Sequence, residues 1–140
     1  ALGLAMNGTG LAEAAVKSIP FGEFNPLVIM VISGLVCFAL SNFISNTATA
    51  ALLIPILTVV CAGMGSKLDS IGGTSTILIG VAVAASCAMS LPISTPPNAI
   101  AYSTGLIQQS DMVKAGATIG VISMIIGYAV LIFFCRMGVL

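Results

Sequence analysis

The stretch Ser41-Asn42-Phe43-Ile44-Ser45-Asn46-Thr47 is a polar island between two apolar runs of the chain. The runs extend from Leu27 to Leu40 and from Ala48 to Ala62. Each run has about 14–15 residues, or about 21–23 Å of helix, whereas the hydrocarbon core of a membrane is about 30 Å thick. We therefore expect that neither run spans a membrane alone. One continuous helix over both runs would be about 55 Å long, which is too long.

A re-entrant helical hairpin over residues 26–63 fits both lengths. Its two half-helices would enter from one side of the membrane and turn near the middle, with Ser, Asn and Thr at the tip. Non-helical backbone at that depth is tolerated only where it is buried in protein or lines a wet cavity. The tip of this hairpin is therefore a predicted binding site.

The composition is that of an integral membrane protein. Of the 140 residues, 59% are hydrophobic and 6% are charged, and the mean hydropathy is +1.20. A soluble domain is about 25% charged, so this chain is expected to be all-α and to have the lipid bilayer as its partner. The formal net charge is zero, which gives no indication of nucleic-acid binding. The four cysteines lie in apolar runs without CxxC spacing, and we interpret them as small hydrophobic residues.

Hydropathy and helix breakers divide the rest of the chain into four segments. The chain starts at Ala1 within an apolar stretch, so we expect a piece of a longer protein. The predicted segments are the end of a membrane helix at 1–10, a connector with a short interfacial helix at 11–25, a broken transmembrane helix at 70–107 and a final continuous transmembrane helix at 112–137.

The break in the third of these segments is Ser94-Thr95-Pro96-Pro97-Asn98. Two adjacent prolines remove two backbone donors, and the residue before a proline is disfavoured in a helix. Like the hairpin tip, this break places hydroxyl and amide groups at the N-terminus of a half-helix, where anions are favoured. The carbonyls that end the preceding half-helix suit a hard cation such as Na⁺. Discontinuous helices hold opposite ions in this way in secondary transporters.

The distribution of charge favours cation-coupled transport of an anion. Neither break contains Lys or Arg, and the basic residues are predicted at the membrane interfaces: Lys17, Lys67, Lys114 and Arg136. An anion in the membrane would therefore depend on helix dipoles, N–H groups and co-bound cations. Because no Asp or Glu is predicted to be buried, a carboxylate proton relay is disfavoured.

Several other interpretations stay open on these residues alone. The Ser/Asn/Thr cluster could be a helix-packing contact, and the Pro-Pro break could be a simple kink. A channel or pore-forming subunit could use the hairpin tip as a filter. An intramembrane enzyme with a Ser or Thr nucleophile is disfavoured, because the chain has no histidine and no other base placed to activate it. We therefore expect no enzyme activity.

At these two breaks the sequence resembles the divalent anion:sodium symporter family. The resemblance is carried by Ser45-Asn46-Thr47 with the following Ala48 to Pro55, and by Ser94-Thr95-Pro96-Pro97-Asn98-Ala99. It implies elevator-type, sodium-coupled symport of dicarboxylates such as succinate, without an organic cofactor. It also implies that this chain is the C-terminal half, that an N-terminal half is missing, and that the carrier is a homodimer in the plasma membrane, the inner membrane in a bacterium.

The resemblance further implies roles for individual residues. The hairpin and the broken helix would belong to the moving transport domain. The substrate would be bound by Asn46, Thr47, Thr95 and Pro96. One Na⁺ would be surrounded by Ser41, the carbonyl of Ile44, Asn46, Ser94 and the carbonyl of Pro96.

Overall fold

The computed structural model describes residues 25–139, and in this range every regular element is a helix, with no strand. The all-α prediction is confirmed. The predicted helix end at 1–10 and all but the last residue of the connector lie outside the described residues. The elements are α3 (Pro26–Phe43), α4 (Asn46–Met64), the 3₁₀ helix η2 (Gly65–Ile71), α5 (Thr74–Cys87), α6 (Pro96–Ser103) and α7 (Gln109–Arg136).

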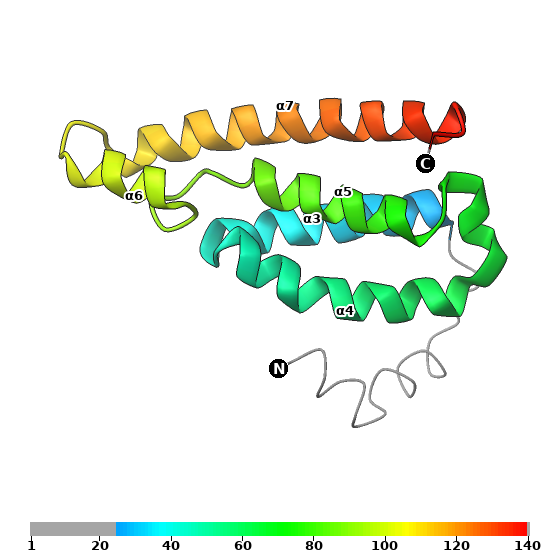
Figure 1. Cartoon of the computed structure of the whole chain (residues 1–140). Helices are drawn as coiled ribbons and strands as arrows, with labels where there is room; N and C mark the ends of the chain where they lie inside the picture. The colour runs from blue at the N-terminus through cyan, green and yellow to red at the C-terminus, as the bar shows by residue number, and fades with distance from the viewer. Residues whose placement is uncertain (1–24, 140) are drawn as a thin grey trace, which may run out of the picture.

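The helices form an elongated bundle with α5 at its centre (Figure 1). Helices α3 and α4 run in opposite directions and are joined by a short turn, which we call the tip. Helix α5 packs against α3, α4 and α7, and it runs back toward the end of the bundle where the tip lies. The α5–α6 connection and α6 lie at this tip end, whereas η2 lies at the opposite end (Figure 1).

Among residues 25–139, three stretches are long and apolar enough to cross a membrane: Pro26–Phe43, Asn46–Ile71 and Gln109–Arg136. This supports a multi-pass membrane protein. The prediction that neither arm of the hairpin is long enough to span is wrong. Helix α3 has 18 residues, or about 27 Å, because it continues from the apolar run through the polar residues Ser41 and Asn42. Length therefore does not decide whether the hairpin is re-entrant.

The helix starts follow from local chemistry. Asn25 caps α3, since its Oδ1 accepts a hydrogen bond from the Leu27 N–H at 3.0 Å, and Pro26 occupies the first turn, where its missing N–H has no cost. Helix α7 starts at Gln109, three residues before the predicted 112. It carries Asp111 in its first turn and Arg136 in its last, as the helix dipole favours.

The broken helix is interrupted earlier than the prolines alone predict. Helix α5 ends at Cys87, and the chain stays non-helical until α6 begins at Pro96. Pro92 contributes, because a helical proline would clash with the carbonyl four residues before it and disfavours a helical residue before it. The predicted second half-helix to residue 107 is also shorter, since α6 ends at Ser103, and Gly105 then turns the chain with φ of 72°.

Tyr128 joins three helices inside the bundle. Its hydroxyl lies 3.1 Å from the carbonyl oxygen of Gly80 in α5 and 3.3 Å from that of Met30 in α3, and it can donate to either. The ring fits because residue 34 of α3 is glycine, where a Cβ would overlap the hydroxyl and lie 2.7 Å from Cζ. Helices α3, α5 and α7 therefore pack as one body.

We expect Gly34→Ala to destabilise the bundle by about 1–3 kcal/mol, the usual cost of overpacking a core. The added methyl group would displace the Tyr128 ring and separate its hydroxyl from both carbonyls. The melting temperature of the purified protein in detergent would measure this. Tyr128→Phe in the same protein removes the overlapping hydroxyl and should restore part of the loss. If the two substitutions destabilise additively, the packing described here is not the cause.

Candidate functional site

The tip is a two-residue interruption between α3 and α4. Ile44 leaves the helix in an extended conformation while its N–H still bonds to the Leu40 carbonyl at 2.9 Å. Ser45 then caps α4, because its Oγ accepts from the Ala48 N–H at 3.2 Å. The N–H groups of the first turn of a helix have no partner within the helix, so α4 begins with Asn46 and Thr47 at a positive dipole end.

The second interruption is the loop of residues 88–95, which we call the break loop. Its carbonyls at Met89 and Leu91 accept hydrogen bonds from the Asn98 side-chain amide at 2.7 and 3.2 Å. Thr95 is extended and precedes α6, but its hydroxyl makes no capping bond to that helix. The Asn98 amide therefore closes the loop onto α6, and the Thr95 hydroxyl stays available to a ligand.

Asn42 connects the break loop to the end of α3. Its Oδ1 accepts from the backbone N–H of Ser90 at 2.9 Å, and its backbone carbonyl accepts from the Ser94 hydroxyl, also at 2.9 Å. Its Nδ2 donates to the Phe38 carbonyl within α3 at 2.8 Å, which fixes the side-chain orientation. The structure therefore brings together the two interruptions, which are about 50 residues apart in the sequence.

The predicted site residues differ in their surroundings. Ser41 is fully buried, and Asn46 is partly buried with a buried Oδ1. Ser94 is buried, and its hydroxyl is engaged twice, since it donates to Asn42 and accepts from the Leu91 N–H at 3.2 Å. Thr95 is half-buried, whereas three predicted residues are exposed: Ile44, Thr47 and Pro96.

Buried polar atoms without a hydrogen-bond partner gather around these interruptions. Within residues 25–139 the side-chain atoms of this kind are Ser41 Oγ, Asn46 Oδ1, Thr49 Oγ1 and Ser90 Oγ. An unsatisfied buried polar group costs about 1–3 kcal/mol. Because all of them belong to the ends of α3 and α4 or to the break loop, this end of the bundle is suited to hold a polar ligand.

Two glycines let α7 approach the break loop closely. A Cβ at Gly116 would lie 2.6 Å from the carbonyl oxygen of Met89 and from the Cα of Ser90. A Cβ at Gly120 would lie 2.6 Å from the carbonyl oxygen of Cys87 and 2.8 Å from the ring of Phe38. Helix α7 therefore packs directly against the break loop, because small residues at these positions allow close packing in membranes.

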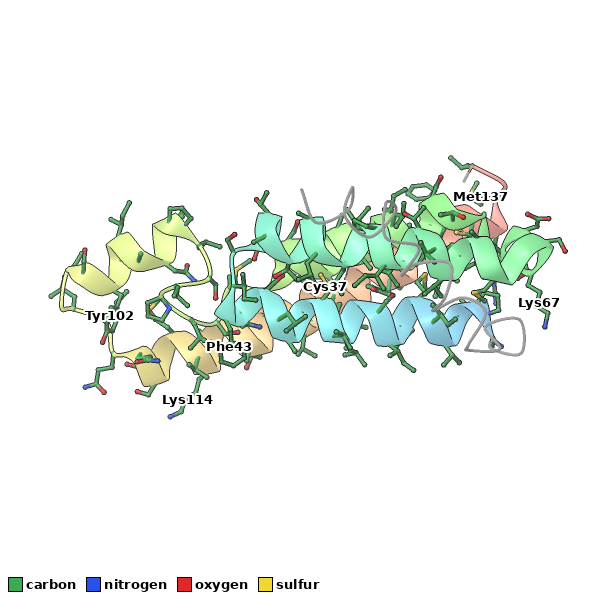
Figure 2. All side chains as sticks on the ribbon, turned by 90° about the horizontal axis from the view of Figure 1, so that it is seen from below. Cys37, Phe43, Lys67, Tyr102, Lys114 and Met137 are labelled. Atoms are coloured by element: carbon green, nitrogen blue, oxygen red, sulfur yellow. The ribbon has the colours of Figure 1, made fainter. Side chains whose placement is uncertain are left out.

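Neither interruption contains a charged side chain, since residues 44–45 and 88–95 have no Asp, Glu, Lys or Arg. Figure 2 shows Lys114 at the same end of the bundle as Phe43 of the tip, and Lys67 at the opposite end. The charged residues of the described range are Lys67, Asp69, Asp111, Lys114 and Arg136. The same range contains no group of His, Cys, Asp or Glu side chains that could hold a metal ion. A cation at the tip would therefore be bound by neutral oxygens.

Sequence reasoning missed several residues that build this site. Asn42 stands within the polar stretch that organises the fold, yet nothing local shows that it would bond to the break loop. Gly116 and Gly120 form a small-xxx-small pattern, a signal of close helix packing that could have indicated their role. Thr49 and Ser90 could have been found only from the faces that their elements bury.

Polar interruptions of apolar membrane helices, held together in this way, are characteristic of secondary transporters. Comparison with known proteins agrees with assignment to this class. Residues 5–139 match the family model described as the sodium:sulfate symporter transmembrane region. The chain therefore belongs to the sodium:sulfate symporter family, which confirms the family resemblance and places it among transporters, not enzymes.

Three relatives illustrate this membership. An uncharacterised transporter of Haemophilus influenzae is 34% identical over 128 residues, which are 89% of this chain and 26% of that protein. An uncharacterised transporter of Methanocaldococcus jannaschii is 33% identical over 102 residues, 73% of this chain and 22% of that protein. The sodium-dependent dicarboxylate transporter SdcS of Staphylococcus saprophyticus is 31% identical over 134 residues, 95% of this chain and 25% of that protein. The chain thus spans about a quarter of their length.

Proposed function

We propose that this chain forms one part of the transport site of a sodium-coupled carrier, with small dicarboxylates such as succinate as substrates. The observation that carries the proposal is the set of unpartnered buried polar atoms beside two helix interruptions that Asn42 holds together. The name of the Staphylococcus saprophyticus relative supports sodium dependence and the dicarboxylate class.

The cation half of the site uses oxygens at the ends of interrupted helices. Ser41 Oγ and Asn46 Oδ1 are buried and have no hydrogen-bond partner among the described residues. The carbonyls of Ile44, Ser94 and Pro96 complete the proposed set of Na⁺ ligands. Ser94 would use its carbonyl, because its hydroxyl already donates one hydrogen bond and accepts another. Neutral oxygens of this kind suit Na⁺, which here is cargo.

The anion half of the site uses helix N-termini. The first turn of α4 presents Asn46 and Thr47 with free N–H groups and a positive dipole end. Helix α6 offers fewer donors, because Pro96 and its neighbour Pro97 have no N–H. The Thr95 hydroxyl, which makes no capping bond, would supply the missing donor. A carboxylate would therefore bind between these two helix ends, close to the Na⁺ that offsets its charge.

The register of α7 places the two interruptions close to the level of Lys114. Lys114 and Arg136 are about 33 Å apart along this helix, close to the thickness of a hydrocarbon core. Gly120, which contacts Phe38, lies about 9 Å inside the Lys114 level, and the tip follows Phe38 by about 9 Å of helix toward the same end. The proposed re-entrant hairpin therefore rests on the family resemblance and not on this register.

The proposal extends to the parts of the carrier outside this chain. The family resemblance implies an N-terminal half with a second Ser-Asn-Thr hairpin, a homodimer and an elevator-type movement of the hairpin with the broken helix. Residues 11–25 would connect this moving part to a scaffold. A bacterial carrier of this kind would lie in the inner membrane.

Uptake of labelled succinate into proteoliposomes that contain the full-length carrier tests the proposed function. We expect saturable uptake that requires an inward Na⁺ gradient and fails when K⁺ replaces Na⁺. Competition by succinate, citrate and sulfate would define the substrate class. An ohmic current without saturation would instead indicate a channel and would refute the proposal.

A further inference from the structure

The buried faces of three elements end in hydroxyl groups at the tip. Helix α3 buries Met30 and Cys37 on the face that ends with Ser41, and α4 buries a face that begins with Thr49. The chain after α5 buries Ser90. The exposed fractions of the three hydroxyl residues are 0%, 1% and 6%. Each therefore stands where an apolar side chain would continue the core.

These hydroxyls differ from those that merely pack in helices of this chain. Ser33, Thr58 and Ser86 each donate to the carbonyl three or four residues earlier, at 2.8–3.0 Å, which is the usual way in which a helical hydroxyl is satisfied. The hydroxyls of Thr49 and Ser90 have no hydrogen-bond partner among residues 25–139, although both residues are more than nine-tenths buried. A role in packing alone therefore does not explain them.

Both hydroxyls belong to residues that neighbour those proposed to bind Na⁺. Thr49 lies one helical turn after Asn46, so the two side chains share a face of α4, and both carry an unpartnered oxygen. Ser90 donates its backbone N–H to the side chain of Asn42, the neighbour of Ser41 in the sequence. Thr49 thus extends the proposed cation site along α4, and the backbone of Ser90 is held against the residue that follows Ser41.

We propose that the hydroxyls of Thr49 and Ser90 are additional oxygen ligands for the transported Na⁺, on the core side of Ser41 and Asn46. This inference rests on the proposed function and deepens its cation half. A hydroxyl is a neutral oxygen donor with two lone pairs, so it coordinates a hard cation without adding charge. The additional oxygens would help to replace the water that Na⁺ loses when it enters the bundle.

Thermal stability of the full-length carrier in NaCl and in choline chloride, without substrate, tests this inference. Na⁺ that binds the folded protein raises its melting temperature. Thr49→Val keeps the side-chain shape but removes the hydroxyl, and we expect about a tenfold weaker apparent Na⁺ affinity in the NaCl titration. In choline chloride the variant should melt at or above the wild-type temperature, because an unpartnered hydroxyl has been removed. Thr49→Ser should retain the wild-type Na⁺ affinity.

Two further variants separate the possible outcomes. Ser90→Ala should weaken Na⁺ affinity as Thr49→Val does, whereas Thr58→Val removes a self-satisfied hydroxyl from the same helix and should leave the affinity unchanged. If Na⁺ raises the melting temperature of the wild type, and Thr49→Val and Ser90→Ala both show the wild-type Na⁺ affinity, the additional ligands are refuted while the proposed function stands. If the wild type does not respond to Na⁺ at all, both proposals fail.

Discussion

Asn46→Ala is expected to lower succinate uptake by about 100-fold at subsaturating substrate, the largest loss among the single substitutions considered. Asn46 starts α4 and carries a buried Oδ1 with no hydrogen-bond partner among the described residues. The proposed site uses this side chain twice, for Na⁺ and for the carboxylate. A hydrogen bond to a charged group contributes about 1.5–3 kcal/mol, and losing both contacts accounts for the expected factor. Initial uptake rates in proteoliposomes, with the Na⁺ gradient held constant, would measure it.

Asn46→Asp separates the two roles of this residue. A carboxylate at this position would attract Na⁺ but repel a dicarboxylate, so we expect uptake to be lost while Na⁺ still raises the melting temperature. Asn25→Ala is the matched control, since it removes an amide that caps α3 at the opposite end of the hairpin. Its cap contributes about 1 kcal/mol to stability and nothing to the site. Uptake by Asn46→Ala at the wild-type rate and with wild-type Na⁺ dependence would refute the site assignment.

Asn42→Ala is expected to have the second-largest effect, although Asn42 is not proposed to touch either ion. The substitution leaves the Ser90 N–H without its acceptor, and it removes the hydrogen bond that the Asn42 side chain donates to the Phe38 carbonyl. A buried donor without a partner costs about 1–3 kcal/mol. We expect that cost to appear as loosening of the break loop, followed by a loss of uptake of at least about tenfold, because the two halves of the site would no longer be held in register.

Hydrogen–deuterium exchange of the full-length carrier would show this loosening directly. The peptide that contains residues 88–95 should exchange faster in Asn42→Ala than in the wild type, while a peptide from the centre of α7 should not change. Thr58→Val, which removes a side-chain hydrogen bond in α4 far from the loop, serves as the control. Unchanged exchange in residues 88–95 together with normal uptake would show that Asn42 does not hold the loop.

The sequence predicted the helix interruptions better than the ends of the helices. A polar stretch between apolar runs indicated the turn at Ile44 and Ser45, and adjacent prolines indicated that a new helix begins near Pro96. Both are local effects of backbone chemistry. The end of α5 at Cys87 was not predictable in this way, because the Ser90 and Leu91 N–H groups leave the helix for side-chain acceptors on Asn42 and Ser94.

The candidate site likewise combines residues that the sequence predicted with residues that only the structure revealed. Ser41 and Asn46 were predicted, and the structure shows that each has a buried oxygen without a hydrogen-bond partner among the described residues. Whether these two residues bind Na⁺ stays a prediction. Asn42 was missed because an amide within a polar stretch gives no sign of its distant partner. The register of α7 against α3 and α5 likewise follows from contacts of Gly120 with Phe38 and Cys87, which are far from it in the sequence.

The sequence by itself determined that this protein is an all-helical membrane protein of the transporter class, and where its helices are interrupted. Hydropathy, proline and helix capping act within a few residues, so they can be read along the chain. Only the tertiary structure decided that the two interruptions meet through Asn42, that Tyr128 joins three helices, and which hydroxyls are buried without a partner. Those features depend on groups far apart in the sequence, whose pairing is set by how the helices pack.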